Sequence, residues 1–368
     1  MRLININRCQ SGMKLGKPIY NEKGKVLLTQ GAELTDKLIS KLKKYNISTI
    51  YIEDEASEGI EIVESIPEEL RNEAVNVITE NFHTIAELHA NKPTLQGMMK
   101  SDRAVRSFQK TFRDILSSLT DNPHALNLLA TTKIQENYLY THSLNVSIYA
   151  CQLAIENGLP LKNIEEIGLG AMLHDLGKMF IPPEITNKSE MLTAEEYEQV
   201  NSHCELGFDT LRKLDGIPLT VAHCALQHHE RMDGTGYPRG LKEDEIHKYA
   251  KVISVADVFD DVTSSRNYRS SLLPHKGLEM LYTGSGTQFE SKQIELFKGC
   301  IAIYPQGLTV ELNDGRTGIV SKYNFHSAGR PEIRIIKDEE QKEVKPYEID
   351  LAANEHLTVE IVEADALL

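Results

Sequence analysis

The feature that most constrains the fold is a set of histidines and aspartates spread over one long segment of helical character. Each lies in or beside a stretch with helical patterning, and the stretches AMLHDLGKMF and LQHHERMDGTGYP each carry an adjacent pair. Helices packed around one centre can project such side chains inward, as in bundle metalloproteins. We therefore expect a helical bundle built around these seven residues: His142, His174, Asp175, His203, His228, His229 and Asp257.

The chemistry of the set indicates which ions it would suit. Five imidazoles and two carboxylates without a thiolate fit first-row divalent ions such as Fe, Mn, Co, Ni or Zn. Calcium and magnesium prefer mainly oxygen ligands. Seven protein ligands are too many for one tetrahedral site with an open position. Two ions that share a carboxylate would use all seven, and Asp175 is the natural bridge because its neighbour His174 can bind one of them.

Each member alone has an ordinary structural explanation. A single His-Asp pair is more often structural than functional, a His-His pair is often solvated, and Asp257 would pass for a helix carboxylate. A turn such as DGTGYPRG usually only reverses the chain. The joint order His, His-Asp, His, His-His, Asp within one helical region is what favours a metal site.

The chain divides into segments of different texture. Residues 1–60 mix β-prone runs with one helical pattern, TDKLISKLKKYN, and predict a small α+β module. Residues 61–125 read as a helical linker region and 126–303 as the domain that carries the metal set. From 304 to 368, β-prone runs around an Asn-Asp-Gly turn predict a small β-rich extension. The expected fold class is therefore mainly α with small β-containing segments at both ends.

Several local signals predict where elements begin and end. Thr193 and Glu196 form a capping-box pattern at the start of one long helix, AEEYEQVNSHCELGFDTLRKL. Asn163 and Gly177 are the expected start and stop of the helix that leads into His174. Pro218 fits the first turn of PLTVAHCALQHHE. Asn21 to Gly24 is the expected turn of an N-terminal hairpin.

Composition narrows the class of protein. The net charge of −14 argues against a broad DNA- or RNA-binding face, because phosphate neutralisation needs clustered Lys and Arg. The five cysteines are scattered without a CxxC pair, as expected of reduced thiols. No stretch reaches the roughly 20 apolar residues of a membrane helix, and no signal peptide is indicated. A cytoplasmic protein is the expectation.

The motifs HDLGK, HHERMDGTGYP and VADVFDDVTSSRNYR, in this order, resemble the HD-GYP family of bacterial cyclic di-GMP phosphodiesterases, a subgroup of the HD metal-dependent phosphohydrolases. The resemblance covers roughly residues 130–303, and IPPEI, LTAEEYE and GSGTQFE also match. It implies an HD-type helical bundle whose metal ligands are the seven residues above, with Asp175 between two divalent ions, iron or manganese by family habit. Cyclic di-GMP would be the substrate, and protein partners and a homodimer are further expectations.

The resemblance also assigns roles around the ligands. Asp175 and Lys178 would be the catalytic residues, with Lys178 against the scissile phosphate. Arg266 and Arg269 match positions that reach the substrate phosphates, although a solvated helix terminus is their ordinary explanation. Gly236, Tyr237 and Pro238, the GYP turn, would shape one wall of the site or a partner-binding surface.

Departures from the family pattern refine the expectation. Some members hold a third metal with a Glu four residues before the first histidine, and here that position is Tyr138, so we expect two ions. Asp261 and Asn267 also differ from the usual residues, and Asp261 adds negative charge near an anionic substrate. Asp260 is expected to orient a ligand histidine. Histidines outside the set match no ligand position and are read as surface or core residues, among them His83, His89, His124, His223, His247, His275 and His326.

The predicted activity is hydrolysis of cyclic di-GMP to pGpG, with GMP as a further product. Two alternatives stay open at this stage. One is a receptor that binds cyclic di-GMP without turnover, which the complete ligand set disfavours. The other is a phosphodiesterase for another cyclic dinucleotide such as cyclic GMP-AMP.

Overall fold

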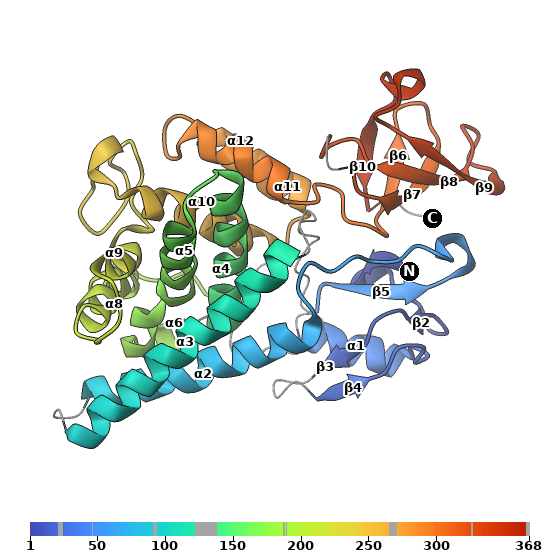
Figure 1. Cartoon of the computed structure of the whole chain (residues 1–368). Coiled ribbons are helices and arrows are strands. Elements are labelled where there is room, and N and C mark those ends of the chain that lie inside the picture. The colour runs from blue at the N-terminus through green and yellow to red at the C-terminus, as the bar shows by residue number, and fades with distance from the viewer. Residues whose placement is uncertain are drawn as a thin grey trace.

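The computed structural model describes residues 1–365 except 21–24, 46, 91–93, 122–137, 187, 189, 265–270 and 325–326. Helices occupy the middle of the described chain and strands occupy both ends (Figure 1). The expected fold class is confirmed: a mainly α protein with a small α+β N-terminal module and a β-rich C-terminal extension. The predicted domain boundaries themselves stay predictions.

The N-terminal module contains two small antiparallel sheets and one helix. One sheet has the strand order β1-β5-β2, and the other pairs β3 with β4 across the predicted turn 21–24, which lies outside the described residues. The helix begins where Thr35 accepts a hydrogen bond from the amide of Leu38. The bounds are β1 Arg2–Asn5, β2 Lys14–Leu15, β3 Ile19–Tyr20, β4 Val26–Leu28, α1 Asp36–Lys44 and β5 Thr49–Glu53.

The C-terminal extension is a five-stranded antiparallel sheet in the order β10-β6-β7-β8-β9. The predicted turn at Asn313–Gly315 joins β6 to β7, and this expectation is confirmed. The sheet packs against the N-terminal module: Leu3 bonds to the carbonyl of Gly307 and shares an apolar cluster with Val310 (Figure 1). The bounds are β6 Thr309–Leu312, β7 Thr317–Lys322, β8 Glu332–Lys337, β9 Glu343–Asp350 and β10 Ile361–Ala364.

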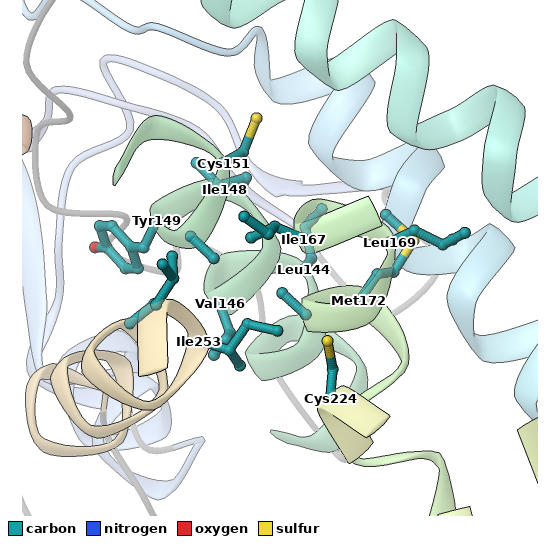
Figure 2. Packing of buried hydrophobic residues seen from close by; sticks show 14 of the residues in the cluster. Leu144, Val146, Ile148, Tyr149, Cys151, Ile167, Leu169, Met172, Cys224 and Ile253 are labelled. Atoms are coloured by element: carbon teal, nitrogen blue, oxygen red, sulfur yellow. The ribbon is translucent and has the colours of Figure 1, made fainter. Parts of the chain in front are cut away.

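The helical part is centred on α4, which is buried from Tyr140 to Ala154 apart from partly buried Gln152. A helix with this little exposed surface must be covered on all sides, and α2, α5, α10 and α12 cover it. Figure 2 shows side chains of α4 beside Ile167 of α5 and Ile253 of α10, and Cys224 of α9 belongs to the same apolar cluster. The bounds are α2 Glu68–Ala90, α3 Leu95–Asp121, α4 Tyr138–Glu156, α5 Leu161–Leu173, α6 Pro183–Thr186, α7 Ala194–Asn201, α8 His203–Leu211, α9 Leu219–Gln227, α10 Lys248–Thr263, α11 Pro274–Thr283 and α12 Ser291–Cys300, with a 3-10 helix, η3, at Leu176–Phe180.

The long helices α2 and α3 are part of this core rather than a separate connection. Phe82 of α2 and Phe108 of α3 are fully buried in the same apolar cluster as α4 and α5, with their rings edge to face at 6.0 Å. The segment that precedes α4 in the sequence therefore lies against the helical core (Figure 1). None of the described helices is both long enough and apolar enough to cross a bilayer.

Three predicted helix ends differ from the structure. α5 begins at Leu161, not Asn163, because the carbonyl of Pro160 already accepts the amides of Asn163 and Ile164. It ends at Leu173, so Gly177 is not its stop but a residue of η3. Pro218 precedes the first turn of α9 as its N-cap.

The helix predicted from Thr193 onward is two helices. Its capping box is present, since the Thr193 hydroxyl accepts from the Glu196 amide while the Glu196 carboxylate accepts from the Thr193 amide. The first helix ends before Ser202, and a second helix begins at His203. This break sets the position of a predicted metal ligand at a helix start.

Candidate metal centre

The structure brings all seven predicted ligands together. His142 comes from the second turn of α4 and Asp257 from α10, while the others lie at helix ends, where α5, α8 and α9 begin or stop. Six of the seven are buried and His229 is partly buried. Five separate helical segments therefore converge on one polar centre inside an apolar core.

The ligand atoms form two groups that share Asp175. One group contains His142, His174 and Asp175, and the other contains Asp175, His203, His228 and His229, with all ligand atoms of each group within 4.8 Å of one another. The two Asp175 oxygens face different groups. Oδ2 lies 3.6 Å from His142 Nε2 and 3.4 Å from His174 Nε2. Oδ1 lies 3.3 Å from His203 Nε2 and 3.7 Å from His228 Nε2.

The Asp257 carboxylate also reaches histidines of both groups. Its Oδ1 lies 3.0 Å from His142 Nε2 and 3.6 Å from His174 Nε2. Its Oδ2 lies 3.7 Å from His229 Nδ1. The sequence marked Asp257 as a ligand but gave no sign that both of its oxygens would be used.

Hydrogen bonds from the second ring nitrogen orient four of the histidines. In three of them Nδ1 lies within hydrogen-bonding distance of the carbonyl three residues earlier: His174 to Ala171 at 2.6 Å, His203 to Val200 at 2.6 Å and His228 to Ala225 at 2.9 Å. A carbonyl only accepts, so Nδ1 must carry the proton. Nε2, the atom that faces the centre, is then available as a ligand, which is how proteins usually present histidine to a metal.

Asp260 does the same for His142. Its Oδ2 accepts from His142 Nδ1 at 2.7 Å, and its Oδ1 accepts from Asn145 Nδ2 at 2.9 Å. The predicted hydrogen bond from Asp260 to a histidine of the set is confirmed. Tyr138 stands where the sequence analysis noted a glutamate in some family members. Its hydroxyl lies 2.9 Å from the same His142 nitrogen and so helps to orient the His142 ring.

The charge balance of this cluster fits bound cations. His203 Nε2 and His228 Nε2 lie 3.2 Å apart although both rings carry their proton on Nδ1, which sets two lone pairs against each other. Burial lowers the pKa of both rings, that of His203 to about 4, so neither is charged at neutral pH. Asp175 Oδ1 and His174 Nε2 are buried without a hydrogen-bond partner. Divalent ions between these atoms would resolve each of these conflicts.

Changing Asp260 tests the orienting bond. We expect Asp260→Ala to weaken metal affinity by roughly 10- to 100-fold, because outer hydrogen-bond partners of metal-binding histidines contribute about that much. Asp260→Asn keeps an oxygen acceptor and should lose less. Competition with a fluorescent chelator for Mn²⁺ measures both variants. Equal affinity in wild type and Asp260→Ala would show that His142 needs no such support.

Lys178 lies beside the centre at the edge of a cavity. Its Nζ is 2.6 Å from Asp175 Oδ2, and its side chain is 23% exposed, so it reaches from the buried cluster toward solvent. The cavity, of about 650 Å³, is lined by Asp175 and Lys178 and continues over η3 and α6 to Leu192 and to Val200 in the last turn of α7. The predicted phosphate-binding residues Arg266 and Arg269 lie outside the described residues.

The GYP turn packs over the second histidine group. The Tyr237 ring lies 4.7 Å from the His229 ring, and the Tyr237 amide donates to the His229 carbonyl. A Cβ on Gly236 would lie 2.4 Å from that carbonyl, so only glycine permits this approach. Of the two predicted roles for the turn, these contacts favour a wall of the site.

One residue that holds the turn was not identified from the sequence. Glu230 is 2% exposed, and its carboxylate accepts from the amides of Arg239 and Leu241 at 2.8 and 2.9 Å. Its place directly after the His-His pair was the only available signal. The GSGTQF segment also contacts the loop that leads into this turn, because the Gln288 carbonyl accepts a hydrogen bond from the Met232 amide.

Gly177 controls how closely η3 approaches α8. A Cβ there would lie 1.9 Å from the carbonyl oxygen of His203. We expect Gly177→Ala to lower the free energy of unfolding by about 3 kcal/mol, at the upper end of overpacking costs, as measured by urea denaturation. Gly299→Ala is the matched control: nothing lies within 4 Å of its Cβ, so it should be neutral or stabilise α12. Equal stabilities of the two variants would contradict this account.

Comparisons with known proteins agree with this arrangement. The HD domain family matches residues 111–292, and a KOW domain associated with the HD domain matches residues 309–366. A cyclic di-GMP phosphodiesterase of Pseudomonas aeruginosa is 33% identical over 236 residues, which cover 64% of this chain and 57% of that protein. A cyclic di-GMP phosphodiesterase of Thermotoga maritima is 33% identical and covers 53% of this chain and 52% of that protein.

A third relative differs in its substrate. A 3′3′-cGAMP-specific phosphodiesterase of Vibrio cholerae is 32% identical over 171 residues, covering 46% of this chain and 33% of that protein. The chain thus spans between one third and three fifths of the length of these relatives. The family match, the curated relatives and the quoted motifs together show that the chain belongs to the HD domain family, in its HD-GYP branch.

Proposed function

We propose that this protein is a metal-dependent phosphodiesterase that hydrolyses cyclic di-GMP to pGpG. The observation that carries the proposal is the Asp175 carboxylate, whose two oxygens face separate histidine groups at the base of a cavity that Lys178 also lines. Relatives named cyclic di-GMP phosphodiesterases support the choice of substrate. The proposed cofactor is a pair of divalent ions, iron or manganese.

The proposed ligands are the seven residues of the centre, with Asp175 shared. Bound divalent ions would supply an acidified water as nucleophile and would neutralise charge on the phosphate oxygens. Lys178 holds a positive charge at the cavity edge, where it would stabilise negative charge that develops on the phosphoryl group. Arg266 and Arg269 are proposed to bind substrate phosphate through their planar donors.

The protein's own residues would also exclude water from the reaction. His174, His203 and His228 are fully buried, and among the described residues the cavity lined by Asp175 and Lys178 gives a substrate access to the centre. In this setting fixed charges act more strongly than in bulk water. Release of pGpG would then follow cleavage of one of the two phosphodiester bonds, with GMP forming only if pGpG binds again.

A second candidate activity is supported by relatives named 3′3′-cGAMP-specific phosphodiesterases. Both substrates present the same phosphodiester to the metal centre and differ in one base. A receptor that binds without turnover is the third candidate, and the close approach of all seven ligands and Lys178 speaks against it.

Turnover of cyclic di-GMP tests the proposal. The protein is purified anaerobically, stripped with chelator, reloaded with Mn²⁺ or Fe²⁺, and its nucleotide products are separated by chromatography. We expect pGpG only from the reloaded protein. Product from 3′3′-cGAMP alone would favour the second candidate, and binding without product would favour the receptor.

The compartment and the assembly are further proposals. The five cysteines are free thiols, as suits the reducing cytoplasm in which we place the protein. The exposed residues of the GYP loop, Asp233, Thr235 and Arg239, are proposed to contact a protein partner. A homodimer stays a prediction that light scattering on the metal-loaded protein would test.

A further inference from the structure

The cavity beside the metal centre has two chemically different ends. Near the centre it carries the charges of Asp175 and Lys178. Farther out, the described lining is mainly apolar and sulfur-containing, with Met179, Ile181 and Leu192 among it. This outer part suits a flat, largely uncharged group better than a phosphate.

The lysine in the outer part of the cavity is already paired with a carboxylate. Lys188 is the one lysine or arginine among the described lining residues there, and its Nζ lies 2.6 and 2.8 Å from the two oxygens of Glu196. A second phosphate would therefore meet no unpaired positive charge among these residues. A purine base needs apolar faces and one or two hydrogen-bonding groups at its edge, as ligand pockets generally provide.

Such a polar group enters the cavity from outside the matched HD domain. His83 belongs to α2 and lines the cavity with an exposed side chain. Its Nε2 lies 3.0 Å from the hydroxyl of Tyr140 on α4, and this hydroxyl also lies 3.6 Å from the sulfur of Met179. Tyr140 is 4% exposed, so its buried hydroxyl holds the His83 ring in place while His83 lines the cavity.

We propose that the outer cavity holds one purine base of the substrate and that His83, oriented by Tyr140, is a specificity-determining residue that hydrogen-bonds the edge of that base. This inference rests on the proposed function for its substrate class. Guanine and adenine differ in the donors and acceptors on their edges, so a single oriented ring nitrogen can favour one over the other. From the sequence, His83 was predicted to be a surface or core residue, because it lies far along the chain from the motifs that mark the metal set.

Base selectivity in His83 variants tests the inference. For the metal-loaded protein, kcat/KM is measured with cyclic di-GMP and with 3′3′-cGAMP, and hydrolysis of bis(p-nitrophenyl) phosphate, which has no base, is measured alongside. We expect His83→Ala to change the ratio of the two cyclic dinucleotides by about tenfold, the upper end of the net effect of losing one hydrogen bond, mainly through KM. Hydrolysis of bis(p-nitrophenyl) phosphate should stay at the wild-type rate.

Matched variants separate recognition from structure. His83→Gln keeps a nitrogen at similar reach and should restore part of the ratio, while Tyr140→Phe should shift it in the same direction as His83→Ala. Glu80→Ala, at an exposed position on the same helix, should leave every rate unchanged. A ratio unaffected by His83→Ala, or equal losses on all three substrates, would overturn the proposal.

Equilibrium binding keeps this test independent of the proposed function. Calorimetric titration of wild type and His83→Ala with GMP and with AMP should show that the variant loses the difference between the two nucleotides. If wild type turns over no cyclic dinucleotide but discriminates GMP from AMP through His83, the proposed activity fails and the base site stands. If wild type binds neither nucleotide, the base site fails.

Discussion

Replacing Asp175 with asparagine is expected to abolish both turnover and stable metal binding. The two Asp175 oxygens face separate histidine groups, as those of Asp257 also do, and asparagine keeps the shape of the side chain while removing its charge. Charge stabilisation by a metal site is worth several kcal/mol in the transition state, so activity should fall by roughly 10³-fold or more. Elemental analysis of the anaerobically purified variant should find far less than the wild-type metal content.

The control for this variant is the same substitution at an aspartate that lies outside the centre. Asp209 of α8 is half-exposed and pairs with Arg212, so Asp209→Asn should retain wild-type metal content and rate. Circular dichroism would confirm that Asp175→Asn is folded. An active Asp175→Asn protein with an altered metal count would show that the catalytic ions are not held by this carboxylate.

Removing the amine of Lys178 is expected to separate catalysis from metal binding. Lys178→Ala should retain the metal content but lose about 10²- to 10³-fold in kcat, the usual effect of deleting one group that stabilises transition-state charge. KM should change less, because the lysine is proposed to act on charge that develops during reaction. Steady-state kinetics combined with elemental analysis measures both quantities.

Lys162→Ala provides the matched control, since Lys162 is 84% exposed on α5. It should behave as wild type in rate and metal content. If Lys178→Ala lost its metal instead, the 2.6 Å contact with Asp175 would be structural, and the lysine would support the centre rather than the reaction.

The sequence was enough to predict that these seven side chains belong together, because most of them lie within short motifs. His174 and Asp175, or His228 and His229, are adjacent in the chain, and Asp260 lies one helical turn after Asp257 on α10. Their convergence then requires only that the helices pack on one centre. His83 could not be found this way, because its distance from Tyr140 depends on how α2 packs across α4, which no local pattern encodes.

The fold shows the same division between local and long-range information. The capping box at Thr193 and the turn at Asn313–Gly315 were predicted because hydrogen bonds among neighbouring residues determine them. The break at Ser202 was not, because it accompanies the close approach of His203 to Gly177 from another segment. Likewise, the packing of Leu3 against Val310 joins two ends of the chain that show no common pattern.

The central claim is a two-ion centre that shares Asp175, and its most direct test measures how many ions each chain binds and whether these ions are magnetically coupled. Protein reconstituted anaerobically with Mn²⁺ would be analysed for metal content and by electron paramagnetic resonance. We predict about two ions per chain that are magnetically coupled, because one carboxylate is proposed to join them. A single ion per chain, two uncoupled ions, or a third tightly bound ion would contradict a two-ion centre built on Asp175.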